Sequence, residues 1–162
     1  MLRVLIVDDH ATLRRGLLGL LKMYPAWEVC GEADSGEAAI RAAAELKPDV
    51  IIMDVAMPGM GGMQATQIIH EAFPAVKIVL FTLHKSTELI RAGFSRGATG
   101  YVLKSDPENE LISALEAVIH NEIYVTACIS PETVSDIVRD MKRSRGVTTD
   151  STRAFKASNS QP

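Results

Sequence analysis

The sequence predicts an α/β fold in which a five-stranded parallel sheet, of strand order 2-1-3-4-5, carries helices on both faces. Three observations support this prediction. Short apolar runs alternate with segments of helical periodicity, the alternation occurs five times, and the central runs are almost continuously Val, Ile and Leu. Continuous apolar runs are typical of strands buried on both faces of a parallel sheet. Such an alternation forms a doubly wound sheet with right-handed crossovers.

The predicted strands are the short apolar runs. They cover Arg3–Val7, Trp27–Ala33, Asp49–Met53, Val76–Thr82 and Gly100–Leu103. The second run is more polar than the others, which favours a position at an edge of the sheet. In the predicted order the other four strands are neighbours, and the fifth lies at the opposite edge.

The predicted helices are the segments with apolar residues at helical spacing. They cover Thr12–Met23, Gly36–Leu46, Gly61–Phe73, Ser86–Arg96 and Glu108–His120. The fourth contains Gly93, and an interior glycine costs about 1 kcal/mol relative to alanine, so we expect this helix to be short or loosely held. A sixth amphipathic helix follows, with Ser130 as its N-cap and Pro131 at its first position.

Composition divides the chain into three parts. With 162 residues, 47% of them hydrophobic, it can form one compact domain with a real core, and we place that domain at residues 1–122. Residues 123–143 form the additional C-terminal helix, and the polar stretch 144–162 is expected to be disordered. A DNA-binding domain is not expected within this chain.

Charge, cysteine usage and hydropathy exclude several classes of function. The formal net charge is −3, so no basic excess points to direct nucleic-acid binding. The two cysteines have neither metal-site nor disulfide-framework spacing, and no apolar run is long enough to span a membrane. A cytoplasmic location, with no membrane partner, fits these features.

Polar residues follow or close four of the predicted strands. Asp8 and Asp9 follow the first strand, Asp54 the third, Thr82 ends the fourth and Lys104 follows the fifth. Ligands bind beyond the carboxyl ends of the strands in sheets of this kind. Because these strands are neighbours in the predicted order, we expect the five side chains to share one crevice.

The expected chemistry of this crevice is magnesium-assisted phosphoryl transfer. Mg²⁺ prefers oxygen ligands, and we predict Asp9 and Asp54 as direct ligands, the Ala56 backbone carbonyl as a further one, and Asp8 acting mainly through water. A carboxylate beside Mg²⁺ can attack phosphorus, and Asp54 is central. Lys104 would neutralise a phosphoryl oxygen, and Thr82 would donate a hydrogen bond to another.

Each of these residues has a simpler interpretation when taken alone. Asp8 and Asp9 could cap the following helix, because acids favour helix N-termini. Asp54 could be an ordinary loop acid, Thr82 a strand-end residue and Lys104 a solvated surface lysine. The combination at four strand ends argues against reading all of them in this way.

Four segments together resemble the receiver domain of two-component response regulators. They are VLIVDDH (Val4–His10), DVIIMDVAMPGMGG (Asp49–Gly62), VLFTLH (Val79–His84) and GATGYVLK (Gly97–Lys104). The last, with the later NEIYVTACISPE, is most similar to the nitrate-response and nitrogen-fixation subfamily, which carries a LuxR-type helix-turn-helix output domain. The resemblance covers residues 1 to about 122.

The resemblance implies a role for each matching residue. Asp54 stands at the phosphoacceptor, Asp8 and Asp9 at the acidic Mg²⁺ pair, and Thr82 and Lys104 at the residues that grip the phosphoryl group. Tyr101 stands at the switch aromatic, although its spacing equally fits a half-exposed tyrosine on an edge strand. Ala56 and His84 occupy positions that influence loss of the phosphoryl group; His84 otherwise reads as an exposed loop histidine.

Three residues depart from the pattern of the family. Ser105 replaces the proline that often follows the active-site lysine, so we expect a trans peptide there. Leu83 replaces a small residue after Thr82, where a bulkier side chain could narrow the path for rearrangement of the switch. Gly93 could loosen the face that partners read. These departures bear on switching more than on phosphorylation.

The resulting functional prediction is a signalling switch rather than an enzyme. A histidine kinase phosphorylates Asp54, and the surface of the fourth helix, fifth strand and fifth helix then controls homodimerisation or an output domain, with DNA contacted only through a domain outside this chain.

Three alternative functions remain. A nucleotide- or flavin-binding protein would need a phosphate-binding loop after the first strand, and this sequence does not have one. A haloacid-dehalogenase-type phosphatase would need a second acid two residues after the nucleophile, where Ala56 stands. A phosphorylation-independent scaffold has to be distinguished by phosphodonor labelling.

Overall fold

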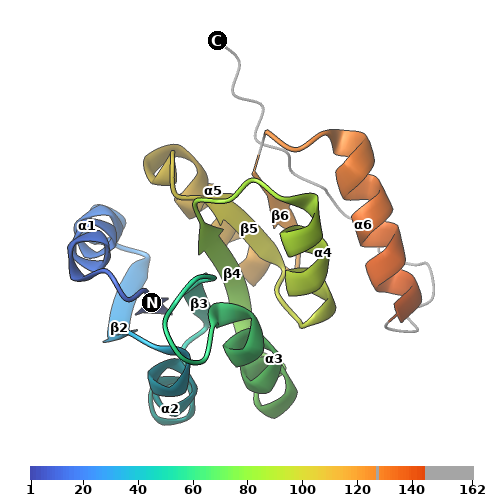
Figure 1. The fold of residues 1–162 in the computed structure, drawn as a ribbon. Helices are drawn as coiled ribbons and strands as arrows, with labels where there is room; N and C mark the ends of the chain where they lie inside the picture. The colour runs from blue at the N-terminus through green and yellow to red at the C-terminus, as the bar shows by residue number, and fades with distance from the viewer. Residues whose placement is uncertain (127, 145–162) are drawn as a thin grey trace.

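The structure is a computed structural model that describes residues 1–126 and 128–144. It is a parallel sheet between two layers of helices (Figure 1). The predicted tail, 144–162, lies outside the described residues apart from Ser144, the last residue of the final helix. Within the described part of the chain, no helix combines the length and apolar composition that crossing a membrane requires.

The elements follow the predicted alternation, with boundaries shifted by at most about two residues. The strands are β1 (Leu2–Val7), β2 (Trp27–Ala33), β3 (Val50–Asp54), β4 (Lys77–Thr82), β5 (Gly100–Leu103) and β6 (Tyr124–Val125). The helices are α1 (Ala11–Lys22), α2 (Gly36–Leu46), α3 (Gly62–Ala72), α4 (Thr87–Ser95), α5 (Pro107–Ile119) and α6 (Pro131–Ser144).

The sheet has the predicted order with one strand added. Its order is β2-β1-β3-β4-β5-β6, and all pairs are parallel. The doubly wound fold and the edge position of β2 are confirmed, but the prediction of five strands omitted β6. This strand pairs Tyr124 with Gly100 and Val125 with Tyr101. Consequently β5 is an interior strand.

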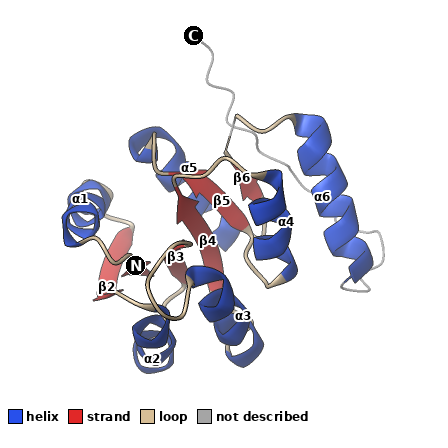
Figure 2. Cartoon of the chain, viewed as in Figure 1, coloured by secondary structure: helices blue, strands red, loops and turns tan. Residues whose placement is uncertain are grey.

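Two apolar cores fill the space between the sheet and its helices. One joins β1, β3 and β4 to α1 and α5, and the other joins the opposite side of these strands to α2, α3 and α4. Figure 2 shows the sheet enclosed by helices in this way. The central strands are buried on both faces, as their continuous apolar composition predicts; Ile51, Ile52, Val79 and Leu80 have no exposed surface.

Helix α4 is short, as expected, and the structure supplies a packing role for Gly93. A Cβ at Gly93 would lie 2.2 Å from Cδ1 of Leu80 on β4. The glycine therefore lets the helix approach the sheet closely, instead of only weakening the helix.

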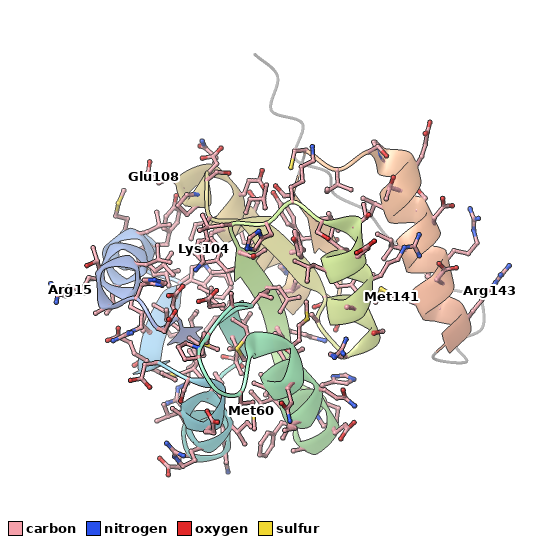
Figure 3. All side chains as sticks on the ribbon, viewed as in Figure 1. Arg15, Met60, Lys104, Glu108, Met141 and Arg143 are labelled. Carbon is pink, nitrogen blue, oxygen red and sulfur yellow. The ribbon has the colours of Figure 1, made fainter. Side chains whose placement is uncertain are left out.

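Helix α6 covers the outer side of α4. The Ser130 hydroxyl accepts a hydrogen bond from Thr133 N at 3.3 Å, which confirms the predicted N-cap. Val134, Ile137 and Met141 are buried and join the core that contains α4. Figure 3 shows Met141 directed from α6 toward α4. The helix is thus packed onto the domain by its apolar face.

Candidate functional site

The polar residues at the strand ends meet at the carboxyl edge of the sheet. Asp8 directly follows β1, and Asp54 is the last residue of β3. In the strand register, Asp54 lies beside Phe81, the residue before Thr82, and Thr82 lies beside Leu103, the residue before Lys104. The structure therefore brings together the residues that the sequence predicted to converge.

Lys104 links two of the acids directly (it is labelled in Figure 3). Its Nζ lies 2.7 Å from Asp8 Oδ2 and 3.1 Å from Asp54 Oδ1. The side chain of Lys104 is 9% exposed, and the side chains of Asp8 and Asp54 are 1% and 3% exposed. The interpretation of Lys104 as a solvated surface lysine is wrong, and so is that of Asp54 as an ordinary loop acid.

The two buried carboxyls have opposite pKa shifts although both lie beside Lys104. Burial alone would raise the pKa of Asp8, but hydrogen bonds from Lys104 and from the His10 backbone outweigh it, so the pKa of Asp8 is lowered. Burial raises the pKa of Asp54 from 3.8 to about 6; Lys104 opposes this shift, and the neighbouring Asp8 and Asp9 add to it. The crevice therefore holds excess negative charge at neutral pH.

The segment after β1 does not cap α1 with its acids. His10 is the N-cap residue, and no side chain makes a cap hydrogen bond there. Asp8 Oδ1 instead accepts from His10 N at 2.8 Å, and the His10 ring Nδ1 lies 3.1 Å from Asp8 Oδ1 and 3.1 Å from Asp9 Oδ1. The capping interpretation is wrong. The sequence analysis did not single out His10, although its position next to two acids was the available signal.

Thr82 and Tyr101 both form hydrogen bonds with the backbone of His84, in the loop that precedes α4. Thr82 Oγ1 accepts a hydrogen bond from His84 N at 3.2 Å, and the Tyr101 hydroxyl donates to the His84 carbonyl. Tyr101 has no exposed surface, so the half-exposed interpretation is wrong; β6 beside it makes β5 an interior strand. His84 is exposed, as the simpler reading has it, and so is Leu83. The peptide between Lys104 and Ser105 is trans, as expected.

The loop after Asp54 is held by close backbone contacts. Ala56 N donates to Asp54 Oδ1 at 3.3 Å, and Met60 N donates to Glu37 Oε1 at 3.3 Å. Gly59 has a φ of 73°, a left-handed conformation that favours glycine. At the start of α3, a Cβ on Gly62 would lie 1.9 Å from the Asp54 carbonyl oxygen. Only glycine allows this approach, which fixes the backbone of Asp54.

The donor set fits a divalent cation. Asp8, Asp9, His10 and Asp54 each offer a ligand atom, and these atoms lie within 4.8 Å of one another. Asp54 Oδ2 is buried and has no hydrogen-bond partner among the described residues. A buried carboxylate oxygen without a partner is costly unless a ligand satisfies it. The predicted Mg²⁺ chemistry is therefore compatible with this cluster.

Comparison with known proteins places this chain in a family of signalling proteins. The family described as the response regulator receiver domain matches residues 4–116. The chain belongs to the response regulator receiver domain family. The response regulator GacA of Pseudomonas viridiflava is 37% identical over 132 residues, which are 82% of this chain and 62% of GacA. The chain thus spans about three fifths of the length of this relative.

Solved structures of two response regulators have the same fold. A two-component response regulator of the LuxR family from Aurantimonas is 34% identical, with a TM-score of 0.75 over 85% of this chain and 96% of that one. The RcsB response regulator of Salmonella typhimurium is 27% identical, and its structure is described as showing conformational dynamism for DNA interaction. Its TM-score is 0.74, over 86% of this chain and 70% of that one.

Proposed function

We propose that this chain is a phosphorylation-dependent switch in which Asp54 accepts a phosphoryl group from a histidine kinase in a Mg²⁺-dependent reaction. The observation that carries the proposal is the buried Asp54, held 3.1 Å from Lys104 beside two further acids. Phosphoryl transfer depends mainly on positioning and on neutralising negative charge, and this arrangement supports both.

In the proposed reaction, a carboxylate oxygen of Asp54 forms a bond to phosphorus. The bond between phosphorus and the histidine nitrogen of the kinase breaks, and its electron pair leaves with the imidazole. Lys104 stays within reach to pair with a phosphoryl oxygen, and Thr82 would donate a hydrogen bond to another. Asp9, Asp54 and the Ala56 carbonyl would hold Mg²⁺, with Asp8 acting through water. When bound, the ion would offset the charge of the incoming phosphate.

The proposed output is a change in the surface of α4, β5 and α5. If the phosphoryl group draws Thr82 inward, the Thr82 hydroxyl leaves His84 N, and the loop that holds the Tyr101 hydroxyl must move. Such a step would bias a pre-existing equilibrium between two states of this surface. Slow hydrolysis of the acyl phosphate resets the switch, and Ala56 provides no acid that would speed it.

The proposed context is a cytoplasmic regulator of transcription. We assign residues 1–122 to the receiver and 123–143 to a linker that leads toward an output domain. GacA extends beyond the matched region, and the RcsB structure concerns interaction with DNA. By analogy, phosphorylation of this receiver would control homodimerisation or release of a DNA-binding domain, and DNA would be contacted only through that domain.

Intact-mass spectrometry after incubation with acetyl phosphate tests the proposal. The wild-type protein should gain one phosphoryl group in the presence of Mg²⁺. Asp54→Asn should gain none, and neither should the wild type in excess EDTA. An adduct that persists in Asp54→Asn would move the acceptor to another residue. A folded wild-type protein with no adduct under any condition would favour a phosphorylation-independent scaffold.

A further inference from the structure

The exposed ring of His10 lies beside two carboxylates of the acidic crevice. Its ring Nδ1 is 3.1 Å from one oxygen of Asp8 and 3.1 Å from one oxygen of Asp9. The side chain is 69% exposed, and as the N-cap residue of α1 it makes no side-chain cap hydrogen bond. Removing the ring would therefore cost little packing and no helix cap.

The four donor atoms are close enough to share one ion after a small contraction. The ligand atoms of Asp8, Asp9, His10 and Asp54 lie within 4.8 Å of one another. Two ligands at about 2.1 Å from a common ion are at most about 4.2 Å apart. The exposed His10 ring can supply most of this adjustment. On Asp54, the oxygen Oδ2 is buried and has no hydrogen-bond partner in the described chain, so it has no competing contact.

A nitrogen donor changes which ion such a site prefers. Mg²⁺ takes oxygen ligands, whereas imidazole suits Zn²⁺, Ni²⁺ and related ions. We propose that His10 makes the acidic crevice a site for a divalent transition-metal ion of the Ni²⁺, Co²⁺ or Zn²⁺ class, which competes there with Mg²⁺. The inference rests on the proposed function in one respect, since both use the carboxylates of Asp9 and Asp54.

The ion pairs of Lys104 leave some carboxylate oxygens unused, which favours His10 as a metal ligand over His10 as only a partner of the carboxylates. Lys104 already pairs with Asp8 Oδ2 and Asp54 Oδ1. Asp8 Oδ1 and Asp9 Oδ1 lie beside the exposed His10 ring, and Asp54 Oδ2 has no hydrogen-bond partner among the described residues, so these oxygens remain available to an added cation. An imidazole among three carboxylates provides a mixed nitrogen and oxygen set, for which affinity rises in the order Mn²⁺, Co²⁺, Ni²⁺. Mg²⁺, in contrast, prefers oxygen ligands alone.

Calorimetric titration of tag-free protein with Ni²⁺ and, separately, Mg²⁺ tests the proposal. All forms carry Cys128→Ser, because the Cys128 thiol is exposed and could bind Ni²⁺ by itself. The wild-type background should bind Ni²⁺ at one site, more tightly than Mg²⁺. His10→Ala should lower the ratio of Ni²⁺ to Mg²⁺ affinity by about tenfold or more. His120→Ala, which removes another exposed histidine, should leave that ratio unchanged.

Three results would overturn the proposal. Equal Ni²⁺ binding by the parent and His10→Ala would show that the ring is not a ligand. An equal loss of Ni²⁺ and Mg²⁺ affinity in His10→Ala would reduce the ring to a support for the carboxylates. An equal effect of His120→Ala would indicate adsorption to surface histidines. Failure of the proposed function is distinguishable, because it appears as a missing phosphoryl adduct in the wild-type protein with Mg²⁺, whichever result Ni²⁺ gives.

Discussion

Asp54 combines burial with a crowded electrostatic environment, and at neutral pH this combination destabilises the ion-free protein. Its pKa is raised to about 6, so the folded chain binds a proton more tightly than the unfolded chain does. The free energy of unfolding therefore falls as pH rises through the range between the ordinary pKa and about 6, and it stays lower above that range. The ionised carboxylate is tolerated in the fold at a cost in stability.

Asp54→Asn should accordingly stabilise the ion-free protein at pH 7.5. The neutral amide removes the cost of burying a charge, and we expect a gain on the order of 1–2 kcal/mol in the free energy of unfolding. The gain should shrink toward zero near pH 4, where the wild-type carboxyl is protonated in the fold. Urea unfolding in EDTA across this pH range measures both effects.

Magnesium provides the control for this prediction. At about a hundred times its dissociation constant, a ligand that binds only the folded state stabilises it by about 2.7 kcal/mol. Mg²⁺ should therefore stabilise the wild type and have much less effect on Asp54→Asn. If Asp54→Asn is instead less stable than the wild type in EDTA at pH 7.5, the ion pair with Lys104 outweighs the burial of Asp54.

Gly62 controls the backbone of Asp54 by its lack of a side chain. In Gly62→Ala the new Cβ would lie 1.9 Å from the Asp54 carbonyl oxygen, so the backbone must move. We expect a loss of about 1–3 kcal/mol in the free energy of unfolding, as for other overpacked sites, together with slower formation of the phosphoryl adduct. Thermal unfolding and intact-mass time courses measure the two effects.

Gly16 in α1 is the matched control for Gly62. A Cβ at Gly16 meets no atom within 4 Å, so Gly16→Ala should stabilise the protein by about 0.5–1 kcal/mol through helix propensity. Its rate of phosphorylation should not change. If Gly62→Ala matches Gly16→Ala in both measurements, the close approach of α3 to Asp54 does not constrain the site.

At the scale of elements, continuous apolar runs and helical periodicity in the sequence predict the strands and helices. The interior strands and the helices are found this way, and the strand ends then locate Asp8, Asp54, Thr82 and Lys104. The sequence could not predict β6, because a two-residue strand is too short to have a periodicity of its own. That omission also left Tyr101 open to the wrong half-exposed interpretation, since its burial depends on β6.

The mutual arrangement of the site residues is a second feature that the sequence could not supply. Spacing along the chain does not reveal that Lys104 contacts both Asp8 and Asp54. Nor does it reveal that hydrogen bonds outweigh burial at Asp8 but not at Asp54, which gives the two carboxyls opposite pKa shifts. The same holds for His10 and Gly62, whose importance depends on contacts with Asp9 and with the Asp54 backbone. These features arise from tertiary packing, which local patterns do not contain.

The docking of α6 depends on its apolar face more than on its charges. Ile137 is 1% exposed, whereas the Arg91–Asp140 pair, at 2.5 Å, joins side chains that are 45% and 58% exposed. Ile137→Ala should weaken docking by about 2 kcal/mol or more, as for other buried aliphatic truncations. Arg91→Ala should cost less than about 1 kcal/mol, because exposed ion pairs contribute little.

Hydrogen exchange of the α6 amides distinguishes these two variants. Ile137→Ala should lose protection in α6 while the central strands β3 and β4 remain protected, since the helix can undock without unfolding the sheet. Arg91→Ala should exchange almost as the wild type does. Equal loss of protection in both variants would mean that the ion pair contributes as much as the apolar contact to holding α6 in place.

For the whole molecule, the position of α6 limits which surface of the receiver a partner can bind after phosphorylation. The proposed switch acts through the loop that begins α4, and α6 covers the outer side of α4 (Figure 1). A partner that requires the face of α4 beneath α6 must therefore displace α6. The proposed rearrangement at Tyr101 and the displacement of α6 involve the same apolar core, which contains both Tyr101 and the buried face of α6.

Phosphorylation of Asp54 should consequently loosen α6. We expect amide exchange in α6 and in residues 83–90 to increase several-fold in the phosphorylated protein with Mg²⁺, while exchange in α1 and α5 changes little. Asp54→Asn, treated in the same way, should show no increase, and Ile137→Ala should show raised α6 exchange before phosphorylation. If the increase is confined to the loop after Asp54 and the loop after Thr82, α6 is a fixed cover, and partners of the phosphorylated receiver must bind a surface that does not include the face of α4 beneath it.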